Sequence, residues 1–345
     1  MEIHDEVKTL VRQILQLIPA KDLRWPSPDT LRSSQNQQFI YTRCFDTANP
    51  RTLGPGRYRY SVLKPLVRNI ENAIVDPEED EISDQLLEAL SELMVEEMPS
   101  EMDAARQQSW VTYATSIDGK DSDIAILESR SVISGSGTTG LRTWEAALHL
   151  GSYLLTSKDS AFSIRGKHIL ELGAGTGLLS ILCGKTLQAS KVLSTDGSEE
   201  VVDSLKTNIQ ANTVESVVTA GVLRWGWHLK DTLLAMLDPD DHIDTVLGAD
   251  VTYDQSIIPA LVSTIRHIFE IWPQVDVIIS ATIRNEDTFA AFEDACHHNE
   301  FSLVEIDFPV QQVDEQQQLF HSTSTHIKIM HIRAPKSIRD PFRID

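Results

Sequence analysis

The sequence contains little cysteine, and its few cysteines form no recognisable group. Cys44, Cys183 and Cys296 are far apart and show neither C-x-x-C nor Cys/His ligand spacing. The pair His297-His298 beside Cys296 is more typical of a solvated helix end than of a metal site. Reduced thiols in a cytosolic or nuclear compartment are therefore the simplest interpretation, and no metal site is expected.

Long uncharged apolar runs are also missing. No stretch approaches the ~18 apolar residues that a membrane-spanning helix needs. The N-terminus carries Glu2, Asp5 and Glu6, without the basic start and apolar centre of a signal peptide. We expect no membrane span and no secretion, and a cytoplasmic location.

Basic charge is scarce. Lys and Arg number 30 against 51 Asp and Glu, so the net charge is −21, which opposes non-specific nucleic-acid binding. No Lys or Arg occurs from Asp76 to Asp103, where a helical stripe is formed by Ile82, Leu86, Leu90, Leu93, Leu87 and Met94. This segment is either a solvated helix face or an acidic surface that meets a basic protein substrate.

The length of the chain allows two domains. With 345 residues and 41% hydrophobic content, it can bury the core of one catalytic domain and of a smaller one. Apolar residues recur at helical spacing from Val7 to Ile18, and residues 109–133 alternate as a hairpin would, with Asp118-Gly119 as a candidate turn. We predict a mainly helical N-terminal domain at 1–130, which recognises the substrate or partner, and a catalytic domain at 131–345.

The catalytic part alternates between helical and extended patterns, which is typical of an α/β sheet with helices on both faces. Helices are expected at Thr143–Leu155, Glu199–Ala211 and Ile257–Ile271, and a solvent-exposed polar loop at Gln311–Gln318. The seven expected strands are His168–Leu172, Lys191–Thr195, Val217–Leu223, Thr245–Leu247, Val275–Ser280, Phe301–Asp307 and His326–Ile332. The fold class is therefore a Rossmann-like, mostly parallel sheet.

The first of these strands runs into a loop with glycine at every second position. Gly173, Gly175 and Gly177 allow a tight turn and a close approach of a ligand to the backbone. Leu178 stands where a dinucleotide-binding loop has its third small residue, so a single adenosine with a small tail, as in S-adenosylmethionine, fits better. Asp196 follows about 20 residues on, where a carboxylate accepts from ribose hydroxyls. The alternative is a glycine turn with an N-capping Asp.

Polar and aromatic residues follow two other strands, at the edge of the sheet where ligands bind. One strand leads to Asp250 and Tyr253, which puts a carboxylate and a phenol beside the expected methyl donor. Another leads to Trp225-Gly226-Trp227, where an indole can cover an adenine face. The alternatives are that both tryptophans are core aromatics, that Asp250 caps a loop and that Tyr253 serves only packing.

Several motifs together resemble a known family, the seven-β-strand protein methyltransferases of family 16. Within it the chain is most similar to the eukaryotic elongation factor 2 lysine methyltransferases. The motifs are Tyr41-Thr-Arg-Cys-Phe45, Ile133-Ser-Gly-Ser-Gly-Thr-Thr-Gly140, Gly137-Thr-Thr-Gly-Leu-Arg-Thr-Trp144, Glu171-Leu-Gly-Ala-Gly-Thr-Gly177, Trp225-Gly226, Ala249-Asp250-x-x-Tyr253 and Thr282-Ile-Arg-Asn285.

The resemblance implies an S-adenosylmethionine-dependent lysine methyltransferase, with elongation factor 2 as the protein substrate. Two residues, Asp250 and Tyr253, would be catalytic and shape the channel for the target lysine. The residues that would bind the cofactor are Trp144, Glu171, Gly173, Ala174, Gly175, Asp196, Trp225 and Ala249. We expect a monomer without a nucleic-acid or membrane partner.

The reaction requires a neutral amine in line with the donor methyl group. A lysine of pKa ~10.4 is neutral in about one molecule in 2500 at pH 7, a cost of roughly 4.6 kcal/mol that desolvation can offset. Asp250 would favour the charged amine, so its expected role is to capture and orient the lysine. Two alternatives stay open: methylation of a small amine of the nicotinamide type, and a non-catalytic binding module.

Overall fold

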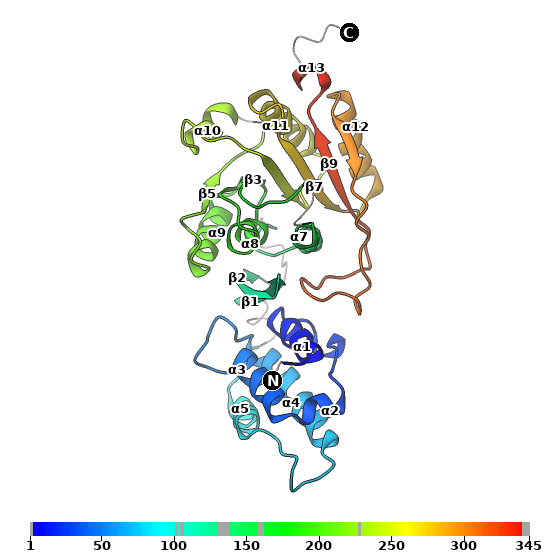
Figure 1. Ribbon diagram of the computed structural model, residues 1–345. Coiled ribbons are helices and arrows are strands. Elements are labelled where there is room, and N and C mark those ends of the chain that lie inside the picture. The colour runs from blue at the N-terminus through cyan, green and yellow to red at the C-terminus, as the bar shows by residue number, and fades with distance from the viewer. Residues whose placement is uncertain are drawn as a thin grey trace. The chain divides into compact units, whose positions relative to one another are not determined.

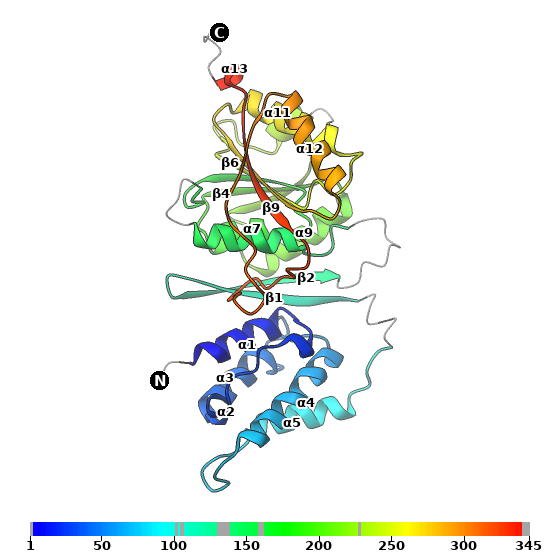
Figure 2. The ribbon, with the colours of Figure 1, turned by 90° about the vertical axis from the view of Figure 1, so that its right-hand side faces the viewer.

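The computed structural model describes residues 3–100, 103, 107–129, 139–157, 162–226 and 229–339. The chain forms two compact units, one of residues 1–133 with 314–320 and one of residues 134–313 with 321–345. Figures 1 and 2 show the helices of the first unit in blue and the sheet of the second in green to red. No helix in the described ranges is long and apolar enough to cross a membrane.

The first unit is mainly helical, as the sequence predicts. Its first helix, α1, buries Val7, Leu10 and Ile14 on one face, which confirms the predicted amphipathic helix. These side chains pack into an apolar cluster with Ile40 and Leu63 from other helices. The helices are α1 (Asp5–Leu15), η1 (Ala20–Asp22), α2 (Pro28–Arg32), α3 (Ser34–Cys44), α4 (Gly56–Ala73) and α5 (Asp84–Val95).

A hairpin completes this unit. Strands β1 (Gln108–Ile117) and β2 (Lys120–Ser129) pair antiparallel, with Ile117 opposite Lys120. Asp118 and Gly119 between them have φ of 52° and 73°, and positive φ at both central residues is what a type I′ hairpin turn uses. The predicted hairpin and its turn are confirmed.

The acidic segment differs from the expectation of one helical stripe. Helix α5 begins at Asp84, because the Asp80 carboxylate accepts from the N–H groups of Val75 and Asp76 and holds the preceding chain in a turn. Leu86 and Leu93 of the predicted stripe are buried, which confirms a helix with an apolar face, whereas Leu87 and Met94 are 38% and 68% exposed.

The polar loop before the last strand was expected to be solvent-exposed, but part of it is buried. Gln316 is only 3% exposed, and residues 314–320 belong to the first unit. The Arg24 guanidinium donates to the carbonyl oxygens of Asp314 and Gln316, and the N–H of Phe320 donates to Gln16 Oε1 at 2.9 Å. The loop is held through its backbone carbonyl oxygens, which every residue has, so its polar composition did not predict this burial.

The second unit contains a seven-stranded sheet in the order β5-β4-β3-β6-β7-β9-β8. All neighbours pair parallel except β9, which runs antiparallel to both β7 and β8. The predicted mostly parallel sheet and all seven predicted strands are confirmed. The strands are β3 (His168–Leu172), β4 (Lys191–Asp196), β5 (Val218–Val222), β6 (Thr245–Ala249), β7 (Asp276–Thr282), β8 (Ser302–Glu305) and β9 (Ile327–Arg333).

Helices cover both faces of this sheet. Helices α7, α8 and α9 lie on one face, and α10, α11 and α12 lie on the other (Figures 1 and 2). Three predicted helices are confirmed as α7, α9 and α11 within two residues at each end. The helices are α7 (Glu145–Thr156), α8 (Leu178–Lys185), α9 (Glu199–Ala211), α10 (Leu229–Ala235), α11 (Ile258–Ile271), α12 (Glu286–His298) and α13 (Lys336–Arg339).

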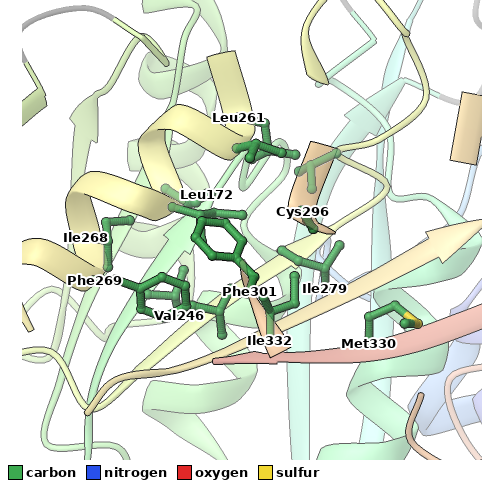
Figure 3. Close-up of a cluster of buried hydrophobic side chains, with 14 of the residues drawn as sticks. Leu172, Val246, Leu261, Ile268, Phe269, Ile279, Cys296, Phe301, Met330 and Ile332 are labelled. Atoms are coloured by element: carbon green, nitrogen blue, oxygen red, sulfur yellow. The ribbon is translucent and has the colours of Figure 1, made fainter. Parts of the chain in front are cut away.

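The core of the second unit lies between the sheet and the helices α11 and α12 (Figure 3). Phe269 of α11 meets Phe301 edge to face, with ring centroids 5.1 Å apart. Val246 and Ile279 contribute the sheet side of this cluster and are fully buried. This packing makes the strands a rigid base, so the residues that follow them are held in fixed positions.

Candidate active site

A cavity of about 920 Å³ opens in the second unit, lined by residues that follow the parallel strands β3, β4, β5 and β6. This is the edge at which open α/β sheets bind ligands. All ten site residues predicted from the sequence line it. They are Trp144, Glu171, Gly173, Ala174, Gly175, Asp196, Trp225, Ala249, Asp250 and Tyr253. Trp227 lies outside the described residues.

The glycine loop between β3 and α8 forms one wall of the cavity. Gly173, Gly175 and Gly177 have φ of 67°, 54° and 83°, a region that residues with a Cβ rarely adopt. A Cβ on Gly173 would lie 2.8 Å from Val251 Cγ1, and one on Gly175 would lie 3.1 Å from the carbonyl oxygen of Gly140. The loop therefore needs glycine for its backbone conformation and for the space around it.

Asp196 ends β4 beside this loop. Its Oδ2 accepts from the N–H of Gly175 at 3.2 Å and its Oδ1 from the N–H of Ser198 at 3.1 Å. Burial raises the pKa of Asp196, and the N–H groups of Ser198, Gly175 and Gly197 oppose that rise. The carboxylate is thus fixed by backbone donors while it lines the cavity, which suits an acceptor of ribose hydroxyl groups.

Glu171 lies deeper, at 2% exposure. The Ser180 hydroxyl donates to its carboxylate, and Ser180 in turn lies 2.7 Å from Ser194 Oγ. Burial raises the pKa of Glu171 to about 7, although the Ser180 bonds act in the opposite direction. The side chain of Glu171 is therefore hydrogen-bonded to Ser180 of α8, the helix that follows the glycine loop.

Trp225 forms a third part of the lining. A Cβ on Gly173 would lie 3.3 Å from Trp225 Cζ2, so the indole packs directly over the loop. The next residue, Gly226, has φ of 79° and donates its N–H to Thr264 Oγ1 at 3.2 Å. The chain turns sharply there, which keeps the indole at the cavity.

Asp250 follows β6, the strand next to β3, and has a left-handed conformation with φ of 57°. Its Oδ1 accepts from the N–H of Thr282 at 3.0 Å, and its Oδ2 accepts from Thr282 Oγ1 at 3.2 Å and from Arg284 Nη2 at 3.1 Å. The side chain is only 7% exposed. Asp250 is therefore a buried carboxylate that is paired with a cation inside the cavity wall.

Arg284 was assigned no role from the sequence, although it lies in the quoted run Thr282-Ile-Arg-Asn285. Its Nη2 also lies 3.3 Å from Glu145 Oε2, and its guanidinium carbon lies 5.0 Å from the Trp144 ring centroid. The guanidinium carbon of Arg142 also lies 5.0 Å from the Trp144 ring centroid, and Arg142 Nη2 lies 3.9 Å from Glu145 Oε1. No spacing in the sequence relates these segments, so only the fold identifies the cluster.

Tyr253 lines the cavity but is 56% exposed. Its residue type and position suit contact with a substrate that arrives from solvent. Exposure of this extent argues against the alternative that Tyr253 serves only packing.

Two other expectations from the sequence concern metals and thiols. The described part of the chain holds no group of three or more His, Cys, Asp or Glu that could ligate a metal. Cys44, Cys183 and Cys296 are free and buried, and burial raises the pKa of each thiol. Such thiols are poor nucleophiles.

The sheet order, the glycine loop and the acid after β4 define a methyltransferase of the Rossmann-like class. The model of the lysine methyltransferase family matches residues 121–295. The chain therefore belongs to this family.

Relatives agree with the family assignment. The protein-lysine N-methyltransferase EFM3 of Chaetomium thermophilum is 44% identical over 93% of this chain and 96% of its own length. EFM3 of Saccharomyces cerevisiae is 33% identical over 65% of this chain and 66% of its own. The protein-lysine N-methyltransferase EEF2KMT of Homo sapiens is 27% identical over 68% of both chains. The protein is an S-adenosylmethionine-dependent protein-lysine N-methyltransferase, which decides against a non-catalytic module and a small-amine enzyme.

Proposed function

We propose that the protein substrate is elongation factor 2 and that its target lysine enters the cavity beside Asp250 and Tyr253. The relative named EEF2KMT supports this choice, as do the segments that resemble elongation factor 2 lysine methyltransferases. The net charge of −21 favours a basic partner surface. An enzyme with this substrate acts in the cytoplasm.

The wall formed by the glycine loop is the proposed binding site for the methyl donor. When bound, S-adenosylmethionine supplies an electrophilic methyl group on a sulfonium. Asp196, held by backbone donors, would accept from the ribose hydroxyls, and Trp225 would cover the adenine. The Gly173, Ala174 and Gly175 backbone would lie against the ligand, with Trp144, Glu171 and Ala249 completing the wall. The glycine conformations and the space that a Cβ would fill fit such a nucleoside.

The part of the cavity lining that follows β6 is the proposed lysine site. Asp250, fixed by Thr282, would capture the ammonium and orient the amine, and the Tyr253 ring would contact the cation from solvent. Positioning two reactants contributes roughly 7 to 11 kcal/mol to such reactions. The observation that carries this proposal is the buried Asp250 carboxylate in the same cavity as the glycine loop.

The test is methyl transfer from tritiated S-adenosylmethionine to purified elongation factor 2 and to extract from cells that lack this enzyme. We expect one labelled band at the size of elongation factor 2, and Asp250→Ala should lower its labelling at least ~100-fold. S-adenosylhomocysteine affinity, measured by calorimetry, should stay within about twofold, because the Asp250 carboxylate bonds to Thr282 and Arg284 and not to the glycine loop.

Asp254→Ala is the matched control, since this nearby carboxylate is exposed and accepts from Ser256 outside the cavity lining. It should retain the labelling. A labelled band of another size would replace elongation factor 2 as the substrate, and full activity of Asp250→Ala would remove Asp250 from the lysine site.

A further inference from the structure

The cavity side of Asp250 carries a cation that belongs to the protein itself. Arg284 Nη2 donates to Asp250 Oδ2 at 3.1 Å, while the other oxygen, Oδ1, is held by the Thr282 N–H. Arg284 is 43% exposed and Asp250 only 7%, and both line the cavity. An ammonium that binds Asp250 Oδ2 therefore competes with this guanidinium.

Arg284 has a second anion within reach. The same Nη2 also donates to Glu145 Oε2 at 3.3 Å, so the guanidinium bridges the two carboxylates and keeps Glu145 when it loses Asp250. The Trp144 ring, 5.0 Å from the guanidinium carbon, supports the planar group by cation–π attraction. Release from Asp250 therefore does not leave Arg284 without a partner.

The charges of this cluster balance before a substrate binds. Asp250 and Glu145 carry two negative charges, and Arg284 and Arg142 carry two positive ones. Arg142 is the outer cation, because its Nη2 lies 3.9 Å from Glu145 and it makes no contact with Asp250 that the structure records. A substrate ammonium is a third cation, and it competes with Arg284 for Asp250.

The geometry points to Arg284 as an internal occupant of the lysine site: it bridges Asp250 and Glu145 until the target lysine displaces it from Asp250, and it then keeps Glu145 as its partner. This inference rests on the proposed role of Asp250 in receiving the lysine. Arg284 gives the buried carboxylate a partner in the free enzyme, since an unpaired buried charge is costly. It also makes the site selective, because a cation occupies the site only if it reaches Asp250 and binds this carboxylate more strongly than the guanidinium does.

The occupant role and a plain positioning role predict opposite signs. If Arg284 competes with the substrate, Arg284→Gln frees Asp250, and the KM for elongation factor 2 falls roughly two- to fivefold, the worth of one partly exposed ion pair. Arg284→Lys retains a competing cation, so its KM stays within about twofold of the wild-type value. If Arg284 only positions Asp250, Arg284→Gln raises KM or lowers kcat, and Arg284→Lys partly restores the loss.

Arg142→Gln is the matched control. It removes the same charge from the Trp144 ring at the same 5.0 Å distance, but it leaves the pair of Arg284 with Asp250 in place. Its KM should not fall. S-adenosylhomocysteine binding, measured for every variant, verifies that the second unit is folded.

A second measurement is independent of the protein substrate. Saturation-transfer NMR with n-butylammonium chloride, which mimics the end of a lysine, should give a larger signal for Arg284→Gln than for the wild type, against sodium chloride at equal concentration. An equal or smaller signal overturns the inference. If wild-type enzyme does not methylate elongation factor 2 and the n-butylammonium signal still rises in Arg284→Gln, the proposed substrate is wrong and the occupant role of Arg284 stands.

Discussion

The two walls of the cavity are built in different ways. The donor wall, the part of the lining around the glycine loop, depends on backbone: three glycines have positive φ, and the N–H groups of Gly175 and Ser198 hold the Asp196 carboxylate. The acceptor wall, the part around Asp250, depends on side chains: Arg284 pairs with both Asp250 and Glu145.

This difference follows from the task of each wall. A nucleoside is recognised through close approach to backbone, which only particular backbone conformations allow. A lysine cation is recognised through charge, and charges can be exchanged between partners. The donor wall should therefore be sensitive to changes of volume and protonation, whereas the acceptor wall should respond to changes of charge by small amounts and with either sign.

The largest expected effect is at Gly173. Gly173→Ala places a Cβ at positive φ and 2.8 Å from Val251 Cγ1, a side chain that is only 2% exposed and has little room to move. We expect a loss of unfolding free energy of roughly 2 to 5 kcal/mol, from about 1 to 2 for the conformation and about 1 to 3 for overpacking. Urea denaturation measures it, and S-adenosylhomocysteine affinity should fall as well.

Gly166→Ala separates the two contributions. Gly166 has φ of 74°, but a Cβ there meets nothing within 4 Å. Its loss of stability should equal the conformational part alone, with donor affinity unchanged. If both variants lose the same stability, contact with Val251 contributes nothing, and the donor wall is less closely packed than its geometry indicates.

The second effect concerns protonation of Glu171. Burial raises its pKa from 4.5 to about 7, so the folded state binds a proton that the unfolded state has released between these pH values. Proton binding by Glu171 therefore contributes fully to the unfolding free energy of the wild-type protein below pH ~4.5, and this contribution is lost as the pH rises to about 7. At ~1.36 kcal/mol per pH unit the loss is on the order of 3 kcal/mol.

Glu171→Gln tests this effect, because an amide of the same shape stays neutral. The unfolding free energy of the variant minus that of the wild type should rise with pH between about 4.5 and 7 and then become constant. Urea denaturation at several pH values measures this difference. A difference that does not change with pH would mean that Glu171 titrates as in water. The Glu171 side chain would then be better hydrated than its exposure of 2% indicates.

The difference between the two walls also explains which features of the molecule the sequence predicts. The alternation of apolar runs predicted the seven strands, and the spacing of Gly173, Gly175 and Asp196 predicted the donor wall, because both are local patterns that backbone geometry imposes. Asp250 and Tyr253 were found from their place after a strand. All ten predicted residues line one cavity.

Arg284 and Glu145 could not be predicted in the same way. They are 139 positions apart, and their contact depends on how α7 packs beside the end of β7. An Arg and a Glu in a charged sequence carry no signal of their own. The burial of Gln316 is similar, since it depends on the Arg24 guanidinium from the far end of the chain. Tertiary partners of ordinary polar residues are what the sequence leaves undetermined.

The smallest effect we predict lies at Glu145, on the acceptor wall. Glu145→Gln removes the second carboxylate of Arg284, whose guanidinium then stays on Asp250. The KM for the protein substrate should rise roughly two- to fivefold, opposite in sign to Arg284→Gln, and donor affinity should not change. Glu199→Gln is the control, because it removes one negative charge from an exposed ion pair with Arg224, outside the cluster. A similar rise in KM for both variants would mean that overall negative charge attracts the substrate. A rise for Glu145→Gln alone would mean that Glu145 holds Arg284 when the lysine takes its place on Asp250.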